Sequence, residues 1–134
     1  MRRYVADTHA VLWFFAREVR RLGRRARRVL ETADGVSVGV VVSVISLWEV
    51  AQLADARRVR LPSGYTAWCD QLEQLPGMHL EPLLRDDVEM ARSLMALPDS
   101  SDRLIAGTAL RLGAPLLTGD GRIAASGRVP VLWD

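Results

Sequence analysis

The sequence predicts an α/β sandwich with a mainly parallel central sheet. Short β-prone runs alternate with amphipathic helical segments along almost the whole chain, which is typical of this class. The valine-rich run from Val36 to Val44 has the continuous hydrophobicity of a strand that helices cover on both faces. At 134 residues the chain fits one compact domain, so we expect a single domain over residues 1–134.

Apolar spacing and turn residues predict the order of the elements. Pro62 to Gly64 marks a loop, Pro98 breaks a helical pattern, and Gly113 closes another. Gly23 leaves the start of the second helix open. The expected elements are a strand at 4–6, helices at 10–16 and 19–33, a strand at 36–44, helices at 47–54 and 65–75, a strand at 78–80, helices at 85–97 and 104–112, and strands at 115–118 and 129–132.

Composition excludes several classes of protein. Hydrophobic residues make up 49% and charged residues 25% of the chain, which is ordinary for a globular domain and argues against disorder. The single cysteine, Cys69, cannot form an intrachain disulfide, so a reducing compartment such as the cytoplasm is expected. Asp7 and His9 interrupt the apolar stretch after Arg2 and Arg3, which favours a buried strand over a signal peptide. No apolar run approaches the roughly 20 residues that cross a bilayer, so no membrane association is expected.

Basic charge is concentrated in one segment. All 18 basic residues are arginines, and the net charge is only +2. The window from Arg17 to Arg28 holds seven arginines against one acid, Glu18. This run fits a solvated helix face, but it also fits a surface that contacts RNA phosphates.

Four carboxylates stand where a parallel sheet would bring them together. Asp7 follows the first predicted strand, and Asp120 follows the strand at 115–118 with one glycine between. Glu49 lies in an otherwise apolar helical segment, and Asp102 lies at the start of a helix. Ligands of such sheets bind beyond the carboxyl ends of the strands, so all four side chains are expected at one rim.

Carboxylates that converge in this way need a cation, because like charges and burial both disfavour their ionised forms. The set offers oxygen ligands without histidine or cysteine, which favours Mg²⁺ or Mn²⁺ over Zn²⁺. Such ions activate water for attack on a phosphodiester, and a second ion roughly 4 Å away can stabilise the leaving oxygen. The sequence therefore predicts a metal-dependent nuclease.

The sequence resembles the PIN-domain family, and within it the VapC-like ribonuclease toxins of toxin–antitoxin systems. The likeness covers essentially the whole chain, and the order and spacing of its acidic segments form the signature. Many relatives have Asp-Pro-Phe-Asp-Arg where this chain has Asp99-Ser100-Ser101-Asp102-Arg103, a departure that affects the local loop and keeps both acids and the arginine. The matching segments are Val5-Ala6-Asp7-Thr8-His9-Ala10-Val11-Leu12-Trp13, Ser46-Leu47-Trp48-Glu49-Val50, Asp99-Ser100-Ser101-Asp102-Arg103-Leu104-Ile105-Ala106, Pro115-Leu116-Leu117-Thr118-Gly119-Asp120 and Val129-Pro130-Val131-Leu132-Trp133.

This resemblance implies a three-layer α/β/α fold, RNA cleavage that depends on Mg²⁺ or Mn²⁺, homodimerisation, and neutralisation by a small antitoxin protein. By position, Asp7, Glu49, Asp102 and Asp120 match the family's catalytic and metal-binding acids, and Thr118 matches a hydroxyl residue before the last acid. An acidic antitoxin segment is a third interpretation of the arginine run. The possible RNA or antitoxin contacts are Arg17, Arg20, Arg21, Arg24, Arg25, Arg28 and Arg103.

Structural interpretations compete with these functional ones. Asp7 and Asp99 can cap helices, and Asp102 can interact with a helix dipole. Glu49 can pair with an arginine. His9 and His79 are expected to make local hydrogen bonds rather than bind metal. The four tryptophans, Trp13, Trp48, Trp68 and Trp133, are expected in the core or at a dimer interface, although an exposed one could stack on an RNA base.

Two other function classes remain as alternatives. One is a catalytically silent PIN-like module that binds RNA or a protein without cutting, which the complete set of acids disfavours. The other is a phosphoacceptor receiver domain, which is also α/β and of similar length. A receiver is expected to have paired acids after its first strand and a late lysine, and this chain contains no lysine.

Overall fold

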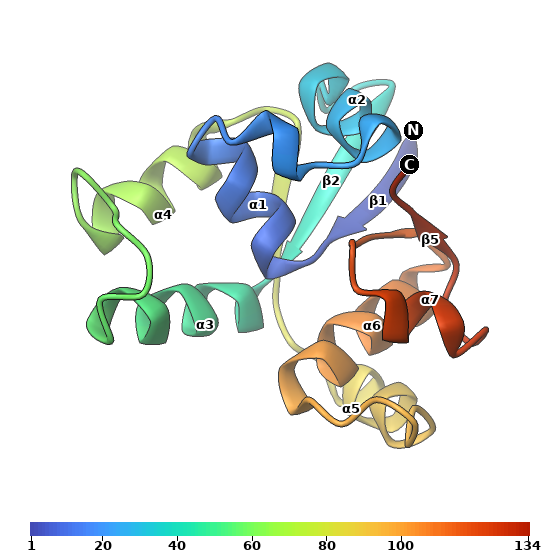
Figure 1. Cartoon of the computed structure of the whole chain (residues 1–134). Helices are drawn as coiled ribbons and strands as arrows, with labels where there is room; N and C mark the ends of the chain where they lie inside the picture. Colours follow the sequence, from blue (N-terminus) through green and yellow to red (C-terminus); the bar gives the residue numbers. More distant parts are fainter.

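The computed structural model describes all residues from Met1 to Asp134. Strands and helices alternate along most of it, as expected (Figure 1). The elements are β1 (Arg2–Ala6), α1 (Thr8–Phe15), the 3₁₀ turn η1 (Val19–Arg21), α2 (Arg24–Thr32), β2 (Val38–Ser43), α3 (Val44–Asp55), α4 (Tyr65–Gln74), β3 (Met78–Glu81), α5 (Arg85–Arg92), α6 (Ser100–Leu112), β4 (Leu116–Leu117), α7 (Gly121–Ala125) and β5 (Val131–Leu132).

The five strands form one sheet in the order β3-β2-β1-β4-β5, and every neighbouring pair is parallel. In register, Ala6 of β1 lies beside Val42 of β2 and beside Leu117 of β4. The carboxyl ends of the three central strands therefore lie at one edge of the sheet. This arrangement confirms the predicted parallel sheet.

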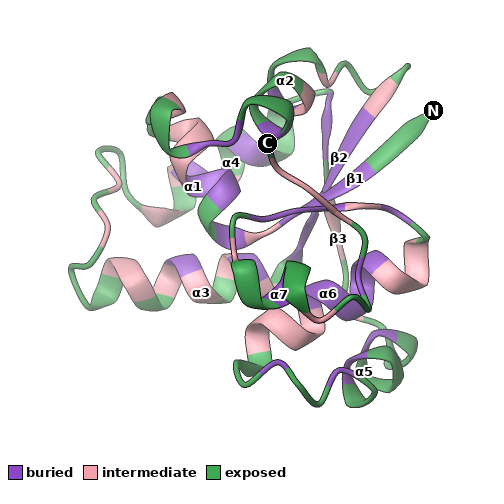
Figure 2. Ribbon diagram, turned by 45° about the vertical axis from the view of Figure 1, so that its right-hand side comes forward, coloured by how far each residue is buried: buried purple, intermediate pink, exposed green.

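Strand residues alternate between two hydrophobic cores, one on each face of the sheet. Tyr4, Ala6 and Val40 pack with residues of α1, α2 and α4, whereas Val5 and Val41 pack with residues of α6 and α7. Figure 2 shows the buried residues gathered in the strands and on parts of the helices that meet the sheet. Helices on both faces confirm the three-layer α/β/α architecture.

Several element boundaries differ from the expectation. The helical stripe from residue 19 breaks into η1 and α2, because the chain at Gly23 lies against the Trp133 carbonyl, which a side chain at that position would strike. The helix at 85–97 ends at Arg92, and α6 begins at Ser100 because Asp99 caps it. The short α7 was not expected, since five residues carry too little periodicity to detect.

A buried ionic cluster joins β3, α5 and α6. Arg111 of α6 donates to Asp87 of α5 at 2.5 Å and to Glu81 of β3 at 2.9 Å. Asp87 is fully buried, and it also accepts a hydrogen bond from the Leu84 backbone N–H at the start of α5. The cluster thus fixes α5 against the hydrophobic core that α6 and α7 form with the sheet.

None of the helices combines the length and the hydrophobicity that a membrane span requires.

Candidate functional site

Asp7 and Thr118 stand side by side at the carboxyl edge of the sheet. Asp7 directly follows β1, and its backbone N–H donates to the Leu117 carbonyl at 3.1 Å, which joins the ends of β1 and β4. The Thr118 hydroxyl hydrogen-bonds the Asp7 side chain and accepts from the Asp120 N–H at 3.1 Å. Thr118 therefore connects two of the predicted acids.

Asp7 also caps α1, since its Oδ1 accepts a hydrogen bond from the Ala10 N–H at 2.8 Å. The structural interpretation of this residue is thus confirmed, and it does not remove Asp7 from the rim. Burial raises the pKa of Asp7, although hydrogen bonds from Thr118 and Ala10 and the charge of His9 oppose the shift. The negative charge of Asp120 adds to the increase.

Glu49 points from α3 toward the start of α1. The Thr8 hydroxyl lies 2.5 Å from Glu49 Oε1, to which it donates, and 2.9 Å from Ser46 Oγ. Burial raises the pKa of Glu49, and the charges of Asp99 and Asp7 add to this effect. Glu49 forms no ion pair with an arginine, so the alternative interpretation, in which Glu49 pairs with an arginine, is wrong. The hydrogen bonds of Thr8 to Ser46 and Glu49 were not predicted, because no sequence pattern links residues 38 or 41 positions apart.

Asp102 lies in the first turn of α6, whose N-terminus Asp99 caps by accepting from the Asp102 N–H at 2.9 Å. Burial, as the largest cause, and the charges of four other acids together raise the pKa of Asp102 to about 7; these acids are Asp99, Glu49, Asp120 and Asp7. Mutual repulsion of this kind requires that the carboxylates lie close together. The predicted convergence of the four acids at one rim agrees with these interactions.

Asp120 differs from the other acids because it has a cationic partner. Its carboxylate caps α7 by accepting from the Arg122 N–H at 2.9 Å, and the Arg122 guanidinium lies 3.3 Å from Oδ2. Burial alone would raise the pKa of Asp120, but the hydrogen bonds and charge of Arg122 outweigh it and lower the pKa. Arg122 was not among the predicted site residues, although its position two residues after Asp120 could have indicated it.

The side chains do not form a complete coordination site in this structure: no group of three or more His, Cys, Asp or Glu side chains is arranged to hold a metal. Three of the four acids are instead engaged locally, Asp7 by Ala10, Glu49 by Thr8 and Asp120 by Arg122. The donor set nevertheless fits Mg²⁺ or Mn²⁺, because it consists of carboxylate oxygens whose repulsion only a cation relieves. Asp7, Glu49, Asp102 and Asp120 are the residues that would hold such an ion.

Comparison with known proteins assigns the chain to a family. The family model described as "PIN domain" matches residues 4–128. The chain belongs to the PIN domain family. Ribonuclease VapC22 of Mycobacterium tuberculosis is 33% identical over 129 residues, which cover 92% of this chain and 91% of that protein. The predicted resemblance is thereby confirmed.

Solved structures share the fold of this PIN domain at low sequence identity. VapBC2 from Rickettsia felis, bound to a promoter DNA fragment, has a TM-score of 0.72 at 14% identity and covers 98% of this chain and 99% of its own. Mycobacterium tuberculosis VapC20, described as a sarcin-ricin loop cleaving toxin, has a TM-score of 0.64 at 19% identity, with coverage of 96% and 98%. FitAcB from Neisseria gonorrhoeae has a TM-score of 0.60 at 18% identity, with coverage of 96% of both chains.

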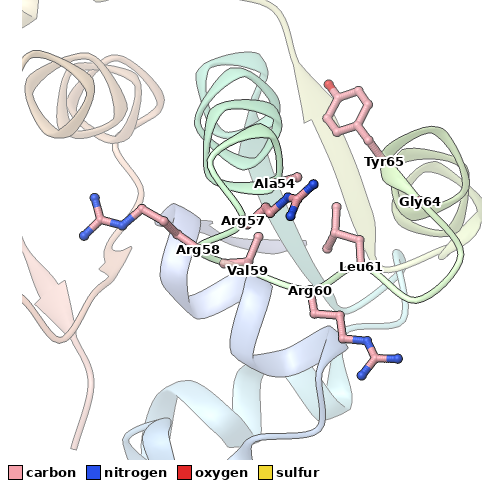
Figure 3. A pocket seen from close by; sticks show the side chains of 8 residues that line it. All are labelled: Ala54, Arg57, Arg58, Val59, Arg60, Leu61, Gly64 and Tyr65. Atoms are coloured by element: carbon pink, nitrogen blue, oxygen red, sulfur yellow. The ribbon is translucent and has the colours of Figure 1, made fainter.

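The PIN domain also carries a groove of about 860 Å³, whose lining includes His9, two residues after Asp7. Apolar side chains of α1, α3, α4 and the α3–α4 connection line it, together with arginines, and we call it the arginine-edged groove. Figure 3 shows a neighbouring pocket that shares Arg58, Arg60 and Leu61 with this groove, and in which Arg58 and Arg60 extend from the connection in different directions. Its lining includes the apolar residues Leu12, Phe15, Leu61 and Trp68 and the arginines Arg17, Arg21, Arg58 and Arg60.

The arginines predicted as RNA or antitoxin contacts differ in their surroundings. Arg17 and Arg21 line the groove, and Arg21 also lies over the Trp13 ring at 4.4 Å. Arg20, Arg24, Arg25 and Arg28 are exposed. Arg103 instead donates to the main-chain carbonyls of Ala91 and Arg92 at the end of α5. Its guanidinium therefore anchors α5 in this structure.

The tryptophans do not share one environment. Trp68 is buried, and Trp13 packs edge-on against Trp133 with ring centroids 6.2 Å apart. The Trp133 indole also packs against Gly119, next to Asp120. Trp48 is 61% exposed beside Glu49 on α3, so it lies outside the core, and the predicted alternatives of a dimer interface or an RNA contact remain for this residue. The two histidines are exposed: His9 stacks on Trp13, and His79 hydrogen-bonds Glu81.

Proposed function

We propose that this PIN domain is a cytoplasmic, Mg²⁺- or Mn²⁺-dependent endoribonuclease and the toxin of a toxin–antitoxin pair. The observation that carries this proposal is the gathering of Asp7, Glu49, Asp102 and Asp120 from four separate segments at one edge of the sheet, where burial and the charges of the neighbouring acids raise the pKa of Asp102 to about 7. The name of its 33% identical relative, a ribonuclease, supports the same activity.

The bound ion would activate water for attack on an RNA phosphodiester and stabilise the charge that develops there. The protein's own residues would position it. Thr118 orients Asp7 and the Asp120 backbone together, and the Thr8 hydroxyl orients Glu49. Glu49 and Asp120 would turn away from Thr8 and Arg122 to reach a shared ion, or contact it through water.

Carboxamide variants test which acids belong to the site. Glu49→Gln should lower the rate of RNA cleavage in Mg²⁺ at least a hundredfold, because it removes a ligand charge. Asp99→Asn is the matched control: asparagine also caps helices, so this variant should keep cleavage within about threefold. An equal loss of cleavage rate in both variants would show that the total negative charge near the site, rather than the predicted set of metal ligands, governs the activity.

The turn between Thr118 and Gly121 offers a test of how accurately Asp120 must be held. A Cβ on Gly119 would lie 2.9–3.1 Å from the Trp133 indole, whereas one on Gly121 would meet nothing within 4 Å. Gly119→Ala should therefore displace the Asp120 backbone and lower cleavage about tenfold or more, and Gly121→Ala should change it less than twofold. Initial rates on one labelled RNA in Mg²⁺ measure both, and equal rates would contradict the positioning role of this contact.

We propose that the arginine-edged groove receives an apolar, acidic segment of the antitoxin. The apolar floor formed by Leu12, Phe15 and Trp68 suits a peptide that buries hydrophobic side chains, and the arginines at the edge suit its acidic residues. Two structural neighbours are a VapBC complex and a toxin–antitoxin complex from Klebsiella pneumoniae.

Charge reversal in the groove should weaken antitoxin binding. Arg60→Glu places a negative charge at the groove edge and should raise the Kd for purified antitoxin about tenfold, as expected for a mutated interface charge. Arg28→Glu, an exposed position on α2 that does not line the groove, should change it less than twofold. Calorimetric titration of both variants distinguishes docking in the groove from general attraction to the arginine run.

We also propose that two copies of the chain associate through the exposed face of α3. Trp48 is 61% exposed and Val44 is 37% exposed one helical turn before it, so both present apolar surface on one side of α3. Trp is enriched at protein interfaces. The wild-type chain should therefore have twice its 14.9 kDa mass in solution.

Trp48→Ser should convert this dimer to a monomer, because an aromatic anchor at an interface centre often contributes 2 kcal/mol or more. Met95→Ser, at an 83% exposed residue between α5 and α6, is the control and should leave the dimer intact. Light scattering after size exclusion measures both masses. A dimeric Trp48→Ser variant would place the interface elsewhere.

A further inference from the structure

Arg122 is the one arginine whose guanidinium contacts a carboxylate of the proposed metal set. Of the seven ion pairs in the structure, only the Arg122–Asp120 pair includes any of the four acids. Its charge also acts on Asp102 and Asp99 across the rim. The guanidinium therefore lies beside the carboxylates that would hold a divalent ion.

The Arg122–Asp120 pair is suited to exchange. Its N–O distances are 3.3 and 3.4 Å, longer than the 2.7–2.9 Å of a strong charge-assisted bond. The Arg122 side chain is 66% exposed, and exposed ion pairs contribute little net stability. A divalent ion attracts a carboxylate more strongly than an exposed guanidinium does. Asp120 can therefore separate from Arg122 with little loss of free energy.

The other arginines near the core formed by α6 and α7 are not free to bind a phosphate, because other groups of the protein already hold them. Arg103 donates to the carbonyls of Ala91 and Arg92, and Arg111 is held by Asp87 and Glu81. Arg122, once separated from Asp120, remains tethered two residues from it. Its five N–H donors match the oxygens of a phosphate in a bidentate manner.

We propose that Arg122 exchanges partners: it pairs with Asp120 in the free protein and binds a backbone phosphate of RNA once Asp120 takes the divalent ion. This inference rests on the proposed nuclease function. In the free protein the guanidinium partly neutralises the rim and competes with the ion for Asp120. In the loaded protein the same group holds the RNA backbone against the acidic rim, which would otherwise repel it.

Two binding measurements test this exchange without relying on cleavage. The first is titration of the RNA-free protein with Mn²⁺. Arg122→Gln should bind Mn²⁺ about three- to tenfold more tightly than wild type, because the competing cation is gone. Arg122→Lys, which keeps the charge but loses the planar fork, should lie between them. Arg128→Gln, at an exposed arginine that forms no ion pair, should match wild type.

The second measurement is fluorescence polarisation of a labelled single-stranded RNA with phosphorothioate linkages, which slow hydrolysis, in saturating Mn²⁺. Arg122→Gln should bind this RNA about tenfold more weakly, although its ion affinity is higher. A structural role alone would weaken both. Unchanged or weaker Mn²⁺ binding, or unchanged RNA binding, would overturn the inference.

These outcomes separate the inference from the proposed function. If the wild-type protein binds RNA with the predicted dependence on Arg122 but cuts no RNA in Mg²⁺, the nuclease proposal fails and the exchange stands. If it cuts RNA and the Arg122→Gln variant behaves like Arg128→Gln, the exchange is overturned and the nuclease stands. Absence of any RNA binding by the wild-type protein would overturn both.

Discussion

Asp102→Asn is expected to abolish cleavage and, at the same time, to stabilise the metal-free protein at pH 8. The activity loss follows because Asp102 would be a direct ligand, and we expect at least a hundredfold lower rate in Mg²⁺. The gain in stability follows from the raised pKa of about 7 in the folded state, against an ordinary value of 3.8. Above pH 7 the folded protein must keep this carboxylate ionised among other acids.

The sign of the effect depends on pH. Because the folded state holds the Asp102 proton more tightly than the unfolded state, the free energy of unfolding falls as pH rises from about 4 to 7. Asp102 is half-buried, so solvent screening reduces the expected penalty to about 2 kcal/mol. The lost helix-dipole interaction offsets roughly 0.3–1 kcal/mol. A net gain of about 1 kcal/mol is expected at pH 8, and none at pH 4.

Urea unfolding of Asp102→Asn and wild type at both pH values, in EDTA, measures this difference. Adding Mg²⁺ should make the wild type more stable than Asp102→Asn at pH 8, because the ion stabilises only a folded protein that binds it. A variant that is less stable than wild type at pH 8 in EDTA would show that Asp102 has a structural partner. It would remove the evidence for repulsion at the rim.

Arg111→Met is expected to lower the free energy of unfolding by about 3–5 kcal/mol, the largest stability effect we predict. The change leaves the fully buried Asp87 and the nearby Glu81 without their shared cation, and removal of one partner from a buried pair has this magnitude. Arg92→Met provides the control, since Arg92 and Glu89 form an exposed pair on α5 and should contribute less than about 1 kcal/mol.

Adding Asp87→Asn to Arg111→Met should recover part of the lost stability, because the unpaired buried charge is then gone. Urea denaturation of the single and double variants gives the coupling energy between the two residues. If Arg111→Met does not fold, Asp87→Asn alone still reports on the pair. A loss below 1 kcal/mol in both single variants would contradict a stabilising role for this cluster.

The sequence was sufficient to predict the layers of the fold and the edge of the sheet at which Asp7 and Asp120 lie. Continuous apolar strands require cover on both faces, and a parallel sheet necessarily brings the residues after β1 and β4 to one edge, which is why Asp7 and Asp120 could be paired. The helix positions of Glu49 and Asp102 followed from local periodicity. These inferences depend on features that are local in the sequence or dictated by sheet geometry.

Contacts between distant segments could not be predicted in the same way. The Thr8–Glu49 hydrogen bond joins residues 41 positions apart, and Arg111 meets Asp87 across 24 positions. The exposure of Trp48 depends on how α3 is rotated on the core, which an apolar segment does not specify. The break at Gly23 depends on the chain end at Trp133.

The most direct test of the proposed function is cleavage of a mixed RNA pool by the purified wild-type protein and by Asp7→Asn, in Mg²⁺ and in EDTA, at one salt concentration. Asparagine can still cap α1, so circular dichroism should show that the variant is folded. We expect cleavage only by wild type in Mg²⁺, with activity restored when excess Mg²⁺ is added back after EDTA. Cutting that persists in EDTA or in Asp7→Asn would contradict a metal-dependent site at the acidic rim, and no cutting under any condition would favour a PIN domain that binds without catalysis.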